Sequence, residues 1–283
     1  MSPNDDAQNG QDGLAEGPDG DQPMSFWDHL GELRAALMKS ALAVVAGFII
    51  CFMYAAEIRE FLAKPLHAAW IEAGLKGEPE LQVLAMMDAF ITDVRVAVAA
   101  GIFLATPVIF YQLWMFISPG LYRKEKRFAI PFVAASVFMF LLGATFCYLL
   151  VLPWTIQWLF GYTQSSAGNT PVIYNLTLND YIRDTTKILV AFGSVFEFPL
   201  LAAFLAAAGV IDHMTLLRFW KIAVVVMFVI AAFLTPPEPV SQMMMAIPMI
   251  VLFFLSVGIA YVLSRPHRQA REDMIARIDD PDR

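Results

Sequence analysis

A single carboxylate interrupts the apolar run of residues 188–210, and this residue, Glu197, is the strongest candidate for chemistry in the sequence. Ionisable residues are costly within a membrane, so they usually face the interior of a helix bundle or a water-filled cavity. Pro199 leaves one backbone carbonyl nearby without its helical partner, which also favours polar surroundings. We therefore interpret Glu197 as part of a polar site within the membrane. The alternative is a protonated carboxyl group that joins two helices through a hydrogen bond.

Two more acids lie beside basic residues at the edges of apolar segments. Glu32 precedes Arg34, and Glu125 stands inside the basic run of residues 123–127. Topology alone explains the basic residues as anchors at the membrane surface, and each acid could belong to a solvated face or pair with a neighbour. Carboxylates are also good partners for guanidinium groups, which bind them through two parallel hydrogen bonds. The two acids together thus form a candidate site for a pair of arginines.

A proline-rich turn divides the last apolar stretch of the chain. Residues 222–264 carry one charge, Glu238, within the sequence Thr-Pro-Pro-Glu-Pro at 235–239. These prolines cannot continue a helix, because proline lacks an N–H group and its ring clashes with the preceding turn. The stretch is therefore predicted to form two helices folded back on each other, the first of them short for a bilayer. The alternative interpretation of Glu238 is an exposed acid in a turn.

The composition defines the elements that must position these residues. Hydrophobic residues make up 58% and charged residues 16% of the 283, and the mean hydropathy is +0.60. A soluble domain usually has about 45–50% apolar and about 25% charged residues. The net charge of −7 argues against a nucleic-acid-binding surface. Cys51 and Cys147 lack metal-site spacing and are expected to be buried thiols. We predict an all-α integral membrane protein surrounded by a lipid bilayer.

Six membrane-spanning helices are expected, because a span needs about 20 mostly apolar residues. A short amphipathic helix that starts at Ser25 is expected to run directly into the first span. The second helix is expected to begin near Asp88, and the third to end at Pro153. Residues 222–264 supply a short fifth and sixth helix, and the first four spans are predicted at residues 35–56, 96–116, 128–152 and 188–210.

One membrane domain, residues 25–264, lies between an acidic tail expected to be disordered (1–24) and a charged tail (265–283).

An even number of spans places both termini on the same side, and short loops rich in Lys and Arg stay in the cytoplasm. The N and C termini are predicted to be cytoplasmic, and two loops with amphipathic pieces lie on the other face. Only six of the 19 basic residues fall on that other face: Arg59, Lys64, Lys76, Arg95, Arg183 and Lys187.

A series of short motifs resembles, in the same order, the motifs of the TatC family, the signal-peptide receptors of twin-arginine protein translocation. The resemblance covers residues 25–264. The acid of the proline-rich turn is Glu238 here, where the family often has an aspartate. The motifs are 29–34 (HLGELR), 64–66 (KPL), 107–116 (PVIFYQLWMF), 121–122 (LY), 125–127 (EKR), 192–193 (FG), 196–199 (FEFP), 234–238 (LTPPE), 241–242 (SQ) and 246–249 (AIPM).

The resemblance implies a role for each candidate residue. Glu32 and Glu125 would bind the twin arginines of a signal peptide, with Arg34 and Phe116 shaping the same cytoplasmic patch. Glu197 would face a concave groove that is accessible to lipid. Further residues would contact single-span partners of the TatA and TatB kind or have structural roles: Thr235, Glu238 and Gln242 for the partners, and Pro65 and Pro107 for the structure.

The resemblance also implies transport of folded proteins across a bacterial inner membrane, driven by the proton gradient, with no bond chemistry and no cofactor. We expect several copies of the chain within a larger complex.

No HExxH, G-x-S-x-G or phosphate-binding glycine motif supports a protease or an ATPase. One alternative is a proton-coupled secondary transporter that uses Glu197, although such folds usually contain repeats and none is visible. A structural scaffold is the third possibility.

Overall fold

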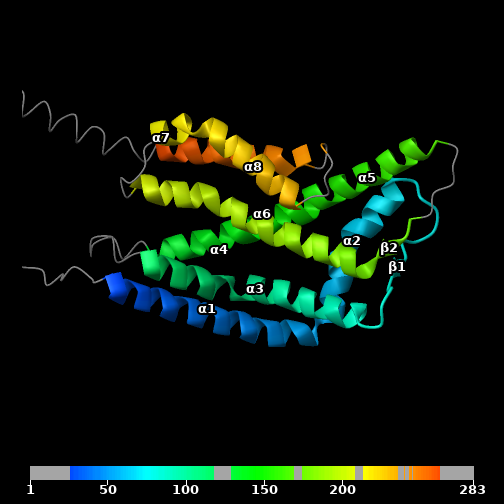
Figure 1. The fold of residues 1–283 in the computed structure, drawn as a ribbon, viewed down its shortest axis with the longest axis horizontal. Helices are drawn as coiled ribbons and strands as arrows, with labels where there is room; N and C mark the ends of the chain where they lie inside the picture. Colours follow the sequence, from blue (N-terminus) through cyan, green and yellow to red (C-terminus); the bar gives the residue numbers. More distant parts are fainter. Residues whose placement is uncertain are drawn as a thin grey trace, which may run out of the picture.

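The computed structural model describes residues 26–117, 129–168, 174–207, 213–234, 239, 242–243 and 245–261, and these residues are almost entirely helical (Figure 1). Residues 245–261 form the last helix of the described chain. The elements before it are α1 (Phe26–Met53), α2 (Ala55–Glu72), β1 (Leu81–Gln82), α3 (Asp88–Ile117), α4 (Ala129–Phe146), the π-helical turn η3 (Cys147–Val151), α5 (Leu152–Ala167), β2 (Leu176–Thr177), α6 (Leu178–Ala207), α7 (His213–Arg218) and α8 (Trp220–Leu234).

Four helices of the described chain are long and apolar enough to cross a membrane, and two shorter apolar helices accompany them. The two shorter helices lie where the fifth and sixth helices were predicted, and six complete spans stay a prediction. The predicted start of the second helix near Asp88 is confirmed. The candidate spans are Leu30–Met53, Asp88–Phe116, Ile130–Ala167 and Leu178–Ala206, with Trp220–Phe233 and Met245–Tyr261 as the shorter pair.

The prediction that the third helix ends at Pro153 is wrong. Helix α4 passes through η3 into α5 without a break, and Pro153 occupies the first turn of α5. A proline has no N–H group to donate, and its ring would clash with the carbonyl group one turn earlier. A π-helical turn is wider than an α-helical turn, so η3 provides the local adjustment that lets the chain continue as a helix. Similarly, α6 begins at Leu178, ten residues before the predicted span.

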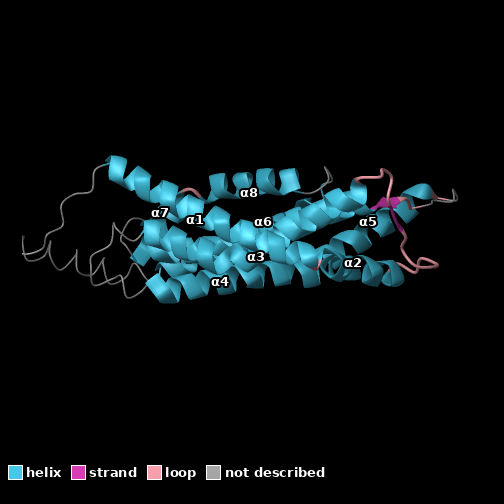
Figure 2. Ribbon diagram, turned by 90° about the horizontal axis from the view of Figure 1, so that it is seen from below, coloured by secondary structure: helices cyan, strands magenta, loops and turns pink. Residues whose placement is uncertain are grey.

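One end of the helix bundle carries a cap built from the two loops that were predicted to contain amphipathic pieces. Helices α2 and α5 lie there, and β1 pairs in parallel with β2 through Leu81 and Leu176 (Figure 2). Trp70 of α2 donates a hydrogen bond of 3.0 Å to the carbonyl of Gly77, and its ring lies 5.5 Å from that of Phe160 in α5. Aromatic packing therefore joins the two cap helices.

Two charged residues near the start of α3, Asp93 and Arg95, bind neighbouring helices at the cap. Asp93 forms an ion pair with Arg59 of α2, whereas Arg95 donates a hydrogen bond of 2.6 Å to Asn179 of α6. The two side chains thus bind different helices, as expected for residues two apart on a helix.

The tails predicted at 1–24 and 265–283 lie outside the described residues. Both cysteines are buried, free thiols, as predicted.

Helices α1 and α3 lie side by side along much of their length (Figure 1). A Cβ atom added to Gly47 of α1 would lie 2.7 Å from the carbonyl oxygen of Gly101 in α3, and one added to Gly101 would lie 2.7 Å from the backbone nitrogen of Phe48. Small residues allow helix backbones in a membrane to approach this closely. The two glycines therefore fix how the start of α1 is aligned with the end of α3.

Candidate functional site

The carboxyl group of Glu197 lies between helices in the half of α6 that leads away from the cap. Its Oε1 atom is buried and has no hydrogen-bond partner within the described part of the chain. The side chain of Ser136 and the backbone of Phe140, both in α4, are hydrogen-bond neighbours of the carboxyl group. A buried polar atom without a partner is costly, and such atoms are rare in folded proteins. Glu197 is thus a polar site with unused hydrogen-bonding capacity.

Ser136 links Glu197 to a third helix. The indole Nε1 of Trp114 in α3 donates a hydrogen bond of 2.9 Å to Oγ of Ser136. Ser136 is fully buried and Trp114 is 5% exposed. Because the serine oxygen accepts from the indole, its own proton remains available for the carboxyl group. Trp114, Ser136 and Glu197 therefore form a polar network that joins α3, α4 and α6.

Aromatic rings surround this network. The Trp114 ring lies 5.0 Å from Phe132 of α4 and 4.7 Å from Phe204 of α6, and the last contact is edge to face. Phe110 and Phe140 belong to the same buried cluster. Such rings exclude water and lower the local dielectric constant, which strengthens the hydrogen bonds inside the network.

Sequence reasoning found Glu197 but missed Ser136 and Trp114 as its neighbours. A serine in an apolar span usually bonds to its own helix backbone, as Ser194 and Ser256 do here. Nothing in the local pattern at Ser136 distinguishes it from those residues. Trp114 lies in one of the family-like motifs, which was its only signal.

Proline residues within the helices leave carbonyl groups that other side chains bind. Pro107 cannot donate to the carbonyl of Phe103, and Oγ1 of Thr106 donates to that oxygen at 2.7 Å. Pro65 likewise cannot donate to the carbonyl of Phe61. The hydroxyl of Tyr148 in η3 donates to that oxygen at 2.7 Å. Hydroxyl groups commonly satisfy backbone groups freed in this way inside a membrane.

Three of the four candidate residues of the predicted arginine-binding patch lie at the end of the bundle opposite the cap. Glu32 and Arg34 lie exposed near the start of α1, and Phe116 lies near the end of α3. These two helix ends are at the same end of the bundle (Figure 1). Glu125 lies outside the described residues, so its position relative to Glu32 is untested.

Of the three predicted partner-docking residues, the structure describes Gln242, which binds α8. Thr235 and Glu238 lie outside the described residues. Nε2 of Gln242 donates a hydrogen bond of 2.8 Å to the carbonyl of Phe228 in α8. From the other side, Nζ of Lys187 in α6 donates to the carbonyl of Phe233, in the last turn of α8. The last four carbonyl groups of a helix lack helical partners, so the ammonium group stabilises this helix end.

The described residues contain no group of three or more His, Cys, Asp or Glu side chains that could hold a metal ion. Their arrangement provides polar contacts at three levels of an apolar bundle. These are an acidic and basic patch at one end, the Glu197 network within the bundle, and the bonded end of α8. The fold defines a polytopic α-helical membrane protein, and these polar sites are candidates for binding other molecules.

Comparison with known proteins gives the family. A family model described as Sec-independent protein translocase protein (TatC) matches residues 28–248. The Sec-independent protein translocase protein TatC of Desulforapulum autotrophicum is 38% identical over 255 residues, which cover 90% of each chain. That of Campylobacter jejuni is also 38% identical, over 87% of this chain and 97% of its own.

A crystal structure described as the twin arginine translocase receptor TatC superposes with a TM-score of 0.73. It is 37% identical, and the alignment covers 83% of this chain and 99% of that one. The chain therefore belongs to the TatC family of Sec-independent protein translocase proteins. It is a component of a protein transport system rather than an enzyme, and the predicted family is confirmed.

Proposed function

We propose that this chain receives twin-arginine signal peptides at the end of the bundle opposite the cap. The observation that carries this proposal is the proximity of the start of α1, with Glu32 and Arg34, to the end of α3, with Phe116. Glu32 and Glu125 would bind the two guanidinium groups, since a carboxylate accepts two parallel hydrogen bonds from an arginine. Arg34 and Phe116 would border the same patch.

Crosslinking tests this receptor site directly. A photoreactive amino acid at position 116 should crosslink to a twin-arginine signal peptide in native membranes. The same amino acid at position 162, exposed on α5 of the cap, should not. Crosslinking at 116 should also disappear when both peptide arginines are replaced by lysine, because an ammonium group cannot form the bidentate contact. A crosslink from 162 alone would reject the site.

We infer that the cap faces the periplasm and that both termini are cytoplasmic, with six spans in a bacterial inner membrane. The excess of basic residues on the terminal side supports this orientation. Cysteine reporters at Gly77 and Ser166 should react with an impermeant reagent from outside. Reporters at Gly120 and Ala270 should react only after the membrane is opened. The reverse pattern would reject the orientation and the cytoplasmic signal-peptide site.

We also propose that the end of α8 is where single-span partners of the TatA and TatB kind dock. Helix α8 has 15 residues and is therefore about 22 Å long, whereas the hydrocarbon layer is about 30 Å thick. Lys187, which binds the last turn of α8, lies nine residues beyond Leu178, or about 13 Å from the start of α6. The turn after α8 would thus be recessed below the cap. Polar groups at that depth can hydrogen-bond a partner helix.

The complete function proposed is assembly with such partners, in a complex with several copies of this chain, for export of folded proteins driven by the proton gradient. The alternative of a secondary transporter receives no support from the comparisons, which find translocase proteins. The two functions differ in the requirement for a partner. Export of a folded reporter should require both this chain and a single-span partner, whereas solute uptake by a transporter would require this chain alone.

A further inference from the structure

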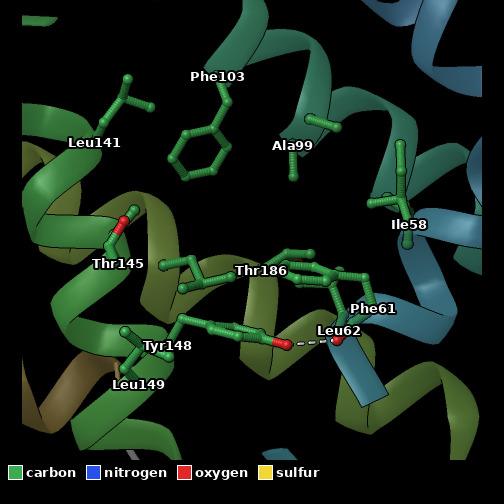
Figure 3. Close-up of a pocket in the computed structure, with 14 residues that line it drawn as sticks. Ile58, Phe61, Leu62, Ala99, Phe103, Leu141, Thr145, Tyr148, Leu149 and Thr186 are labelled. Carbon is green, nitrogen blue, oxygen red and sulfur yellow. Dashed lines mark hydrogen bonds between the residues drawn. The ribbon is translucent and has the colours of Figure 1, made fainter. Parts of the chain in front are cut away.

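A cavity of about 520 Å³ lies on the cap side of the Glu197 network, between α2, α3, α4, η3 and α6. Figure 3 shows Phe103 and Ala99 on one side, Leu141 and Tyr148 on the other, and Ile58 at the edge. Its volume falls in the range of about 300–1,000 Å³ that is typical of binding sites for small molecules. Nothing described so far uses this cavity, and Glu197 does not line it.

The polar groups in the cavity wall are largely satisfied within the protein. The hydroxyl of Tyr148 donates to the carbonyl of Phe61 at 2.7 Å, and that of Thr186 donates to the carbonyl of Ile182 at 2.7 Å. Thr145 provides the remaining hydroxyl of the wall. Every other side chain that lines the cavity is a hydrocarbon. The wall can therefore offer dispersion contacts to an apolar ligand and little else.

Two stacked rings border one end of the cavity. Phe61 and Tyr148 lie parallel, with an interplanar angle of 7° and ring centroids 4.6 Å apart. Tyr148 reaches this position from the π-helical turn η3, and the carbonyl that it binds is the one that Pro65 leaves unpaired. A π-helical turn inside an α-helix often marks a functional site. Both irregularities of the backbone, at Pro65 and at η3, thus shape this end of the cavity.

Residues of α3, α4 and α6, which belong to the candidate spans, form most of the cavity wall, and α2 of the cap completes it. A bilayer around these spans would surround most of the cavity with hydrocarbon. The lining residues Ala99, Phe103 and Leu141 fall well inside the long apolar helices α3 and α4. Water would find too few polar partners there, since a buried water needs two to four of them. An extended peptide segment would bring backbone N–H and carbonyl groups that the wall cannot bind. A saturated hydrocarbon chain brings no such groups.

We propose that this cavity binds one acyl chain of a membrane phospholipid as a resident ligand. The chain would enter from the side of the bundle and end against the stacked rings of Phe61 and Tyr148. It would fill the space between the α2–α3 wall and the α4–η3 wall. The lipid would thereby replace side-chain packing that the described helices do not supply at this level.

A photoreactive phospholipid tests this proposal. The full-length protein is reconstituted in vesicles of phosphatidylethanolamine and phosphatidylglycerol, with a diazirine in the acyl chain of a trace lipid, and the labelled residues are mapped. Ala99→Phe fills the cavity. Ala41→Phe makes the same change on an exposed position of α1 and serves as the matched control. Size-exclusion chromatography confirms that both variants are folded.

The proposal predicts concentrated labelling on residues 99–103 and 145–149 of the natural protein. Ala99→Phe should reduce this labelling severalfold, and Ala41→Phe should leave it unchanged. Equal labelling in all three proteins would overturn the proposal, because it would describe ordinary contact with the bilayer. It would also be overturned if a probe in the apolar part of a signal peptide labelled residues 145–149 and the lipid probe did not. Neither result would bear on the arginine-binding patch.

Discussion

The indole of Trp114 and the hydroxyl of Ser136 share a hydrogen bond of 2.9 Å that joins α3 to α4 beside the carboxyl group of Glu197. This bond gives Glu197 a fixed polar neighbour inside an apolar bundle. Because Ser136 accepts from the indole, its own proton is available for donation to the carboxyl group. The site should therefore require a hydrogen-bond acceptor at position 197 more than it requires a charge.

We expect Glu197→Gln to be tolerated much better than Glu197→Leu, because an amide oxygen can still accept from Ser136. The leucine variant leaves the buried hydroxyl without its partner, which costs about 1–3 kcal/mol of unfolding free energy. Chemical unfolding in mixed micelles and export of a folded reporter protein measure the two effects. Equal export defects in both variants would show that ionisation is needed, and would favour a role in proton coupling.

Close contact between Gly47 and Gly101 should limit what these positions accept. Gly101→Ala is expected to lower the unfolding free energy by about 1–3 kcal/mol, because the added methyl group overlaps the backbone of α1. Gly161→Ala in α5 is the control, since a Cβ atom there meets nothing within 4 Å. An alanine in an open helical position is neutral or stabilising. Similar losses at both positions would refute the importance of the contact.

Tyr148 and Pro65 should be coupled in a double-mutant cycle. Tyr148→Phe removes the hydroxyl that binds the carbonyl of Phe61 and should cost about 1 kcal/mol of unfolding free energy. In a Pro65→Ala background the new N–H group can bind the same carbonyl, so the loss should be smaller. Urea unfolding of the four proteins in micelles gives the coupling energy. An equal loss in both backgrounds would mean that the tyrosine acts independently of the proline.

Lys187 should control how partners bind at the end of α8. Lys187→Met leaves the carbonyl of Phe233 without its cation and should weaken crosslinking from Gln242 to a single-span partner. Lys187→Arg should retain it, because it keeps the charge. Arg183→Met, one turn earlier on α6 and paired with Asp180 and Asp184, is the control. Unchanged crosslinking in Lys187→Met would exclude this contact from partner docking.

A second test of the same region changes the length of α8. Four residues, Leu-Ala-Leu-Ala, inserted after Ile230 would lengthen the helix by about 6 Å and raise the recessed turn toward the cap. The fold should survive, while crosslinking from Gln242 and export should both weaken. Full crosslinking in the lengthened protein would show that partner docking does not depend on the short length of α8.

Much of the helix pattern could be predicted from the sequence, because apolar length and proline chemistry act locally. The start of α3 at Asp88 and the end of α8 at Leu234 follow from those rules. Pro153 misled the prediction because a π-helical turn, which depends on tertiary packing, let the helix continue. The bond from Trp114 to Ser136 joins residues 22 apart on different helices, and no spacing rule reports such a pair. The same holds for Lys187 and Phe233.

The receptor assignment depends most directly on Glu32 and Glu125. Binding of a fluorescent twin-arginine signal peptide to the natural protein should be compared with binding to Glu32→Ala/Glu125→Ala in the same membrane mimetic. Glu57→Ala/Glu60→Ala removes two acids from α2 of the cap and is the matched control. We predict that the first double variant loses specific binding while remaining folded and inserted, and that the control binds normally. Undiminished binding to Glu32→Ala/Glu125→Ala would contradict the proposed receptor function of this patch.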